Sequence, residues 1–301
     1  MQKLGTGISI WMWYPLPCFN RVRYTYWMVQ IQQNSSGRRL PLRRFRVLAG
    51  LFLWMVIVGQ VSAEERKLET CLETAETPLD KMECFRGLPY RVDGALDEHG
   101  RWTFWADPNK EAASAGLNCS GFVAAASRSI WGQTFSLEAT KNDRLNDSGP
   151  EAPMGEDWDF GLDLILNLTD ELPRQLIPNP YEYQGIDSHS WNAVDLRGVN
   201  IDSMAFPDML AQLQHGKIYY FAISRPDRKF KGGISFYHVG IILREKSAIW
   251  MYHATAKAGV SRVNLTGERG VAWFRRYYGA SPRGPKHIQL IEITLTNSVV
   301  N

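Results

Sequence analysis

The sequence predicts an α+β domain in which a cysteine-bearing helix packs on an antiparallel sheet. Phe122, Ala126 and Ile130 fall on one face of a helix over 120–130, and Gly132 ends that helix. The final third of the chain instead holds short segments that alternate or run apolar between turn signals: Lys217–Ile223, Phe236–Leu243, Ala248–His253, Gly259–Leu265 and His287–Ile293. A helical half followed by successive strands is typical of an α+β fold.

Composition places the chain among globular proteins. Hydrophobic residues make up 45% of the 301 residues and charged residues 22%, which excludes wholesale disorder, collagen-like repeats and a multi-pass membrane protein. Residues 1–63 carry eight Lys or Arg and no Asp or Glu, so residues 64–301 hold 26 basic and 31 acidic side chains. A body with this balance has no basic footprint for nucleic acid, and we expect no nucleic-acid partner.

The N-terminal region predicts export. Five arginines lie within 38–46, an uncharged apolar run covers 47–59, and Val61-Ser62-Ala63 offers a small-residue cleavage site. Thirteen apolar residues are too few to span about 30 Å of hydrocarbon, which takes about 20, so a retained anchor is the weaker alternative. We expect a secretory signal, cleavage after Ala63, no stable membrane anchor afterwards, and a periplasmic, envelope or secreted location. Residues 1–37 match no element or targeting signal, and translation could start downstream of Met1.

The rest of the chain, 64–301, is expected to form one catalytic domain with a long insertion. Residues 64–86 read as helix broken at Pro78, and 87–108 read as loop. Residues 133–214 form an acidic insertion with a short helix over 160–168. Five side chains of this insertion either line a substrate groove, form a lid or simply cover one face of the sheet: Asp157, Trp158, Asp159, Phe160 and Trp191.

Cysteine usage singles out one thiol. Past the expected signal only three of the four cysteines remain. Of these, Cys71 and Cys84 lie 13 residues apart and could form a disulfide in an oxidising compartment, which leaves Cys119 unpaired. Asn118 is a favoured N-cap type and places Cys119 in the first helical turn, where backbone N–H groups and the helix dipole favour thiolate. We therefore interpret Cys119 as a nucleophile, against the alternative of a small buried side chain.

Two histidines supply the matching base. Arg244-Glu245-Lys246-Ser247 is the polar break between two apolar strands, and pairing Leu243 with Ala248 places His238 directly opposite His253. A cysteine, a base and a group that orients the base form the constellation of nucleophilic acyl transfer. The sequence contains no G-x-S-x-G motif, the nucleophile elbow of many serine hydrolases, so a serine nucleophile is not indicated.

A metal site and a cofactor are not expected. His215, His238 and His253 with Cys119 form no short pair of metal ligands, and the remaining histidines, His99, His189 and His287, are assigned solvated or structural roles.

Five segments, in order, resemble the NlpC/P60 family of cell-wall cysteine peptidases. They are Gly87-Leu88-Pro89-Tyr90, Asn118-Cys119-Ser120-Gly121-Phe122-Val123, His215-Gly216-Lys217-Ile218-Tyr219-Tyr220-Phe221, His238-Val239-Gly240-Ile241-Ile242-Leu243, and Tyr252-His253-Ala254 followed by Gly259-Val260. The 119 positions from Cys119 to His238 are about twice the spacing usual in that family.

The resemblance implies a papain-like fold, a Cys119–His238–His253 triad and Tyr90 beside the thiolate. It further implies hydrolysis of a γ-D-glutamyl–diamino acid bond in peptidoglycan stem peptides, with Ser120 and position 118 at the substrate. Asn118 stands where the family often has aspartate, and it supplies no charge to pair with a substrate ammonium. Two alternatives stay open: an amidase, thioesterase or acyltransferase on another substrate, and a non-catalytic envelope-binding module.

Overall fold

The computed structural model describes residues 67–144, 157–178, 196–230 and 233–294. The chain divides into two units, residues 1–57 and 58–301, and every described residue belongs to the second. The expected signal segment, the basic run, His189 and Trp191 lie outside the described residues.

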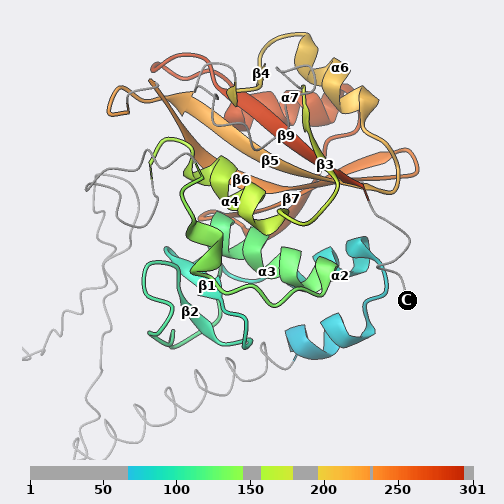
Figure 1. The fold of residues 1–301 in the computed structure, drawn as a ribbon. Helices are drawn as coiled ribbons and strands as arrows, with labels where there is room; N and C mark the ends of the chain where they lie inside the picture. Colours follow the sequence, from blue (N-terminus) through green and yellow to red (C-terminus); the bar gives the residue numbers. More distant parts are fainter. Residues whose placement is uncertain (1–66, 145–156, 179–195, 231–232, 295–301) are drawn as a thin grey trace, which may run out of the picture. The chain divides into compact units, whose positions relative to one another are not determined.

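An antiparallel sheet of seven strands forms the centre of the second unit (Figure 1). Its main path runs β3-β9-β5-β6-β7-β8, and β4 also pairs with β9. The strands are β3 (Arg174–Ile177), β4 (Val199–Asn200), β5 (Lys217–Pro226), β6 (Ile234–Glu245), β7 (Ala248–Thr255), β8 (Gly259–Asn264) and β9 (His287–Thr294). The α+β class expected from the sequence is therefore confirmed, and each of the five expected strands is present.

Helices cover both faces of this sheet (Figure 1). On one face lie α3 (Cys119–Trp131) and α4 (Phe160–Leu168), which pack on residues such as Tyr220 and Ile241. On the other face lie α6 (Ala205–Gln212) and α7 (Gly267–Tyr278), which pack on residues such as Phe221 and Ile242. Because successive strand side chains point to opposite faces, each central strand serves two separate cores.

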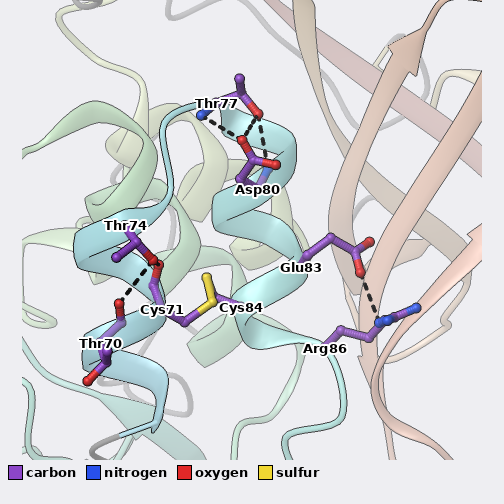
Figure 2. The surroundings of a disulfide bond; sticks show 8 residues. All are labelled: Thr70, Cys71, Thr74, Thr77, Asp80, Glu83, Cys84 and Arg86. Atoms are coloured by element: carbon purple, nitrogen blue, oxygen red, sulfur yellow. Dashed lines mark hydrogen bonds and ion pairs between the residues drawn. A yellow bond between two sulfur atoms is a disulfide. The ribbon is translucent and has the colours of Figure 1, made fainter.

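The N-terminal helices are tied to each other and to the sheet. Helical residues 67–74 and α2 (Pro78–Phe85) are joined by a disulfide between Cys71 and Cys84, the pair considered from the sequence (Figure 2). Pro78 begins α2 rather than ending a helix, because the first helical position needs no N–H donor. Glu83 then accepts hydrogen bonds from Tyr252 on β7, at 2.6 Å, and Arg262 on β8, at 2.7 Å.

Residues 87–108 were expected to form a loop, but only part of this segment is loop. They contain a two-stranded antiparallel ribbon of β1 (Gly94–Leu96) and β2 (Trp102–Phe104). The ribbon packs directly on α3: a Cβ added at Gly121 would lie 2.2 Å from the carbonyl oxygen of Gly94. Strands of three residues carry too little alternation to be visible in a sequence, which is why this ribbon was missed.

The expected insertion, 133–214, is in its described parts built into the same layers. It supplies α4, β3, β4 and α6, besides a short 3₁₀ helix (Ala139–Lys141). Trp158 is buried against Phe236, with ring centroids 6.3 Å apart, and Phe160 contacts Trp105 edge-on at 6.0 Å. These aromatic side chains therefore pack in the core of the α3 and α4 face.

Across the described ranges, none of the helices combines the length and the apolar character that crossing a bilayer requires.

Candidate active site

Cys119 is the first residue of α3, and Asn118 caps that helix as expected. The Asn118 side-chain oxygen accepts a hydrogen bond from the N–H of Gly121 at 2.6 Å, and its carbonyl oxygen accepts one from Phe122 at 2.9 Å. The N–H of Asn118 in turn donates to the carbonyl of Gly94 at 2.9 Å. Asn118 therefore fixes the start of the helix, which confirms its predicted role as N-cap; its expected contact with substrate stays a prediction.

The Cys119 thiol has a raised pKa, contrary to the expectation of a resting thiolate. Burial of the sulfur is the main cause, because a low-dielectric environment disfavours the charged form. The backbone N–H of Val239, the Ser120 hydroxyl and the N–H groups of Ser120 and Cys119 act in the opposite direction and lower the pKa. Helix-start donors thus do surround the sulfur, but they do not outweigh desolvation in the free protein.

His238 and His253 lie on neighbouring strands in a register that differs from the expected one. In the structure Glu245, and not Leu243, pairs with Ala248, so the two residues Lys246 and Ser247 connect the strands. The expected placement of His238 directly opposite His253 was therefore wrong. Continuing this register puts His253 opposite Gly240 and His238 two residues away on the diagonal. A shift of two residues keeps both side chains on the same face, because the side-chain period of a strand is two.

A β-bulge at Tyr237 directs His238 toward its partner. Ile223 on β5 pairs with His238, but Ser224 pairs with Phe236, which leaves Tyr237 as the extra residue. Such a bulge twists a strand and changes the direction of the side chains beside it. As a result, Tyr237 and His238 both contact residues on the α6 and α7 face of the sheet.

Three polar atoms then meet on this face: Nε2 of His238, Nδ1 of His253 and the hydroxyl oxygen of Tyr278. The two histidine nitrogens are 3.1 Å apart, and the hydroxyl oxygen is 2.8 Å from His238 and 2.7 Å from His253. Tyr278 is the last residue of α7 and is buried. Within the described residues this triangle uses one nitrogen of each ring, and Nδ1 of His238 takes no part in it.

Burial keeps the three groups in their neutral forms. It lowers the pKa of His238 to about 3, with a smaller contribution from His253, and it lowers the pKa of His253 to about 4. Burial also raises the pKa of Tyr278, and ionisation of the neighbouring Tyr277, Tyr237 or Cys119 would raise it further. Tyr278 therefore remains a hydroxyl, able to donate one hydrogen bond and accept another at the same time.

The thiol lies close to this triangle. Val239, whose N–H interacts with the sulfur, directly follows His238, and Cys119 contributes to the raised pKa of Tyr278. The structure contains no hydrogen bond between the Cys119 sulfur and the His238 ring, both of which are described. Catalytic hydrogen bonds are commonly long in free enzymes and shorten when substrate binds.

Tyr90 and Ser120, the other two residues expected at the site, also lie beside Cys119. Tyr90 forms a parallel bridge with Leu117, and its pKa is raised by burial and then by the charge of Cys119. Its segment is held against β8 because Gly259, at φ +63°, brings the backbone close to Leu88; a Cβ there would lie 2.2 Å from the Leu88 carbonyl oxygen. Ser120 is buried and lowers the pKa of Cys119 through its hydroxyl.

Tyr278 is the site residue that the sequence analysis missed. Helix α7 buries Val271, Phe274 and Tyr278 along one stripe, so its final tyrosine reads as one more core side chain. The available signal was chemical: a buried tyrosine hydroxyl requires a partner, and the two strand histidines were the nearest candidates without one.

In the part of the chain that is described, no three His, Cys, Asp or Glu side chains are grouped to hold a metal ion. His99 and His215 are exposed, and His287 begins β9 at the edge of the β4 pairing.

Comparison with known proteins corrects the family assignment. No family model matches the chain, and no curated protein matches it. Among solved structures it is similar to protein LPG0564 from Legionella pneumophila str. Philadelphia 1, described by the family model DUF1460, with 13% identity and a TM-score of 0.47 over 79% of this chain and 95% of that one. DUF1460 is a family distinct from NlpC/P60, so the assignment to NlpC/P60 was wrong. Five short motifs in order do not identify a family when each contains few specific residues.

Proposed function

We propose that this chain is a cysteine hydrolase that cleaves an amide or acyl bond with Cys119 as nucleophile. The observation that carries the proposal is the meeting of a helix-start thiol, two neutral strand histidines and a tyrosine hydroxyl. Nε2 of His238 is held by His253 and Tyr278, and the residue after His238 contacts the thiol through its N–H, which is the order of groups that nucleophilic catalysis needs. A papain-like order, with the nucleophile helix before the strand that carries the base, is part of this proposal.

The first step transfers one proton and forms one bond. As the sulfur attacks the substrate carbonyl carbon, the thiol proton passes to Nδ1 of His238, which has a free lone pair when Nε2 of the neutral ring holds the proton. The imidazolium then donates from Nε2 into the triangle, to His253 Nδ1 or to the Tyr278 oxygen. The N–H groups at the start of α3 stabilise the oxyanion of the tetrahedral intermediate.

The second half of the reaction reverses these transfers. His238 returns the proton to the leaving amine or alcohol, and an acyl thioester on Cys119 remains. Water then attacks the thioester while His238 takes its proton, and the sulfur leaves and is protonated again. Tyr278 and His253 are positioning residues in this scheme, because they keep the Nε2 proton of His238 in place and leave Nδ1 free.

The substrate that we propose is a peptidoglycan stem peptide, cleaved at the γ-D-glutamyl–diamino acid bond in the cell envelope. The expected export signal supports this location. A second candidate is an amidase, thioesterase or acyltransferase that acts on another substrate. Asn118 favours it, because its side chain is neutral and already occupied by the helix cap.

The decisive experiment compares the full-length wild type with Cys119→Ala. Both are incubated with whole peptidoglycan and with a free stem tripeptide, and products are identified by mass spectrometry. Cysteine-dependent release at the γ-D-glutamyl bond would establish both the chemistry and the substrate. Cleavage of neither substrate, together with Cys119-dependent turnover of another amide or acyl compound, would favour the second candidate. No Cys119-dependent cleavage of any amide, ester or thioester substrate would overturn the hydrolase.

A further inference from the structure

Two cations share one aromatic ring beside the candidate base. The guanidinium carbon of Arg225 lies 4.8 Å from the ring centroid of Tyr237, and the ammonium nitrogen of Lys286 lies 5.6 Å from it. Arg225 and Tyr237 lie on the adjacent strands β5 and β6, and Lys286 directly precedes β9. These positions are neighbours because Ser224 on β5 pairs with both Phe236 on β6 and His287 on β9. The sheet therefore brings both cations to the same ring.

Within the described residues Arg225 and Lys286 form no ion pair, and Nε of Arg225 is buried without a hydrogen-bond partner. A buried donor without a partner is unfavourable, so its presence needs a reason. The pKa of Lys286 is lowered by burial and then by the charge of Arg225, while Asp202 opposes this.

The nearby acids are engaged with other groups. Asp202 accepts a hydrogen bond from the N–H of Ala280 at 2.7 Å. Asp227 accepts from the N–H of Lys229 at 3.1 Å and from the hydroxyl of Ser235 at 3.4 Å. Within the described residues neither Asp202 nor Asp227 forms an ion pair with Arg225 or Lys286, so both cations keep donors that could bind an external anion.

This pair of cations adjoins the candidate site. Tyr237 directly precedes His238, with ring centroids 6.5 Å apart, and the His238 ring in turn stacks on Tyr278 with ring centroids 5.1 Å apart. A group held by Arg225 and Lys286 would therefore lie a short distance from the bond that Cys119 attacks.

We propose that Arg225 and Lys286 form a subsite for a substrate carboxylate close to the scissile bond. This inference rests on the proposed function. The planar guanidinium can bind a carboxylate with two parallel hydrogen bonds, and Lys286 adds charge. Tyr237 holds both cations in place through cation–π contacts. A γ-linked glutamyl residue fits this subsite, because linkage through its side chain leaves its α-carboxylate free.

The test uses thiol reagents, so that it does not depend on a known substrate. Full-length protein reacts with maleimides whose tethers of increasing length end in a carboxylate or in the matching carboxamide. Alkylation of Cys119 is measured by peptide mapping. At the tether length that reaches the subsite, the carboxylate reagent should react roughly tenfold faster than its carboxamide. A tenfold ratio corresponds to the free energy that about one hydrogen bond to a charged group contributes.

Substitutions show which residues cause the faster reaction of the carboxylate reagent. Arg225→Gln and Lys286→Gln should each reduce the ratio of rates, and Arg225→Lys should retain part of it because it keeps the charge. Arg228→Gln and Lys229→Gln are the matched controls, since both remove exposed cations from the turn after β5. A ratio near one at every tether length, or an equal reduction in the controls, would overturn the subsite.

A second measurement separates failure of the subsite from failure of the hydrolase. Succinate, its diamide and inorganic phosphate are titrated against Cys119→Ala by calorimetry, with and without Arg225→Gln. Succinate binding that Arg225→Gln removes supports the subsite even if Cys119 proves unreactive. Tighter binding of phosphate than of succinate would contradict the carboxylate assignment, as would binding of the diamide equal to that of succinate.

Discussion

Two buried tyrosines, one on each face of the sheet, use their hydroxyls in different ways. Tyr220 on β5 lies 2.8 Å from the Ser127 hydroxyl and accepts a hydrogen bond from Trp131 Nε1 at 2.9 Å. Tyr278 on α7 contacts the nitrogens of His238 and His253 at similar distances. Each hydroxyl is fully satisfied and each ties a helix to the sheet.

The difference lies in the partners. Ser127 and Trp131 do not titrate near neutral pH, so the Tyr220 network can only hold α3 in place. The partners of Tyr278 are imidazoles beside a thiol, so that network can also accept and return a proton. Similar geometry therefore gives a structural role on one face and a candidate catalytic role on the other. Four predictions test this contrast.

Removing the base should have the largest effect. His238→Gln should reduce kcat/KM roughly a thousandfold, in the range typical of a lost general base, and leave the fold intact. The assay is cleavage of the substrate identified with the wild type. The double variant Cys119→Ala/His238→Gln should be no less active than Cys119→Ala alone, because residues that act as a unit are not additive. An additional loss in the double variant would contradict a shared role.

Substitution of the orienting histidine should have a graded effect. His253→Ala should reduce kcat roughly a hundredfold, whereas His253→Asn and His253→Gln should lose less, because an amide can still contact Nε2 of His238. Steady-state kinetics of the three variants measure this order. Equal losses in all three would argue against an orienting role.

The two tyrosines can be compared directly. Tyr278→Phe should reduce kcat roughly tenfold and move the acidic limb of the pH profile to lower pH, because the imidazolium loses an acceptor. Tyr220→Phe should leave the kinetics unchanged but lower the free energy of unfolding by about 1–3 kcal/mol, because Ser127 and Trp131 lose a buried partner. Enzyme kinetics against pH and denaturant unfolding distinguish them. A pH profile altered equally by both substitutions would remove the contrast.

The smallest effect concerns stability in acid. Burial lowers the pKa of His253 to about 4 from its ordinary value of 6.5. Between these two pH values His253 is protonated in the unfolded chain but not in the folded protein. This histidine should therefore lower the free energy of unfolding by about 1 kcal/mol between pH 6.5 and 5.5, with no further loss below about pH 4.

Urea unfolding of wild type and His253→Gln across this pH range isolates the contribution of His253 to the free energy of unfolding. The difference between two proteins is needed because burial raises the pKa of Asp163 to about 7, which changes stability with the opposite sign. His99→Gln replaces an exposed histidine and is the matched control. A wild-type slope that His253→Gln does not reduce would show that His253 is not held neutral.

Much of the fold could be predicted because its signals are local. Strands such as β5 and β7 are long enough for their apolar pattern to appear, and Asn118 and Gly132 marked both ends of α3. The ribbon of β1 and β2 and the edge strands β3 and β4 have only two to four residues each. Their pairing depends on surfaces supplied by α3 and β9, which are distant in sequence.

The sequence by itself determined the candidate side chains: Cys119 at a helix start, outside the Cys71–Cys84 disulfide, and two histidines that share one face of a hairpin. Only the tertiary structure decided how they meet. The hairpin register follows from Lys246 at φ +51°, a turn that no glycine or asparagine signalled. The burial that keeps His238 and His253 neutral, and the hydroxyl of Tyr278 between them, come from α7. Such long-range packing leaves no periodic trace along the chain, because it depends on which surfaces meet and not on which residues are neighbours.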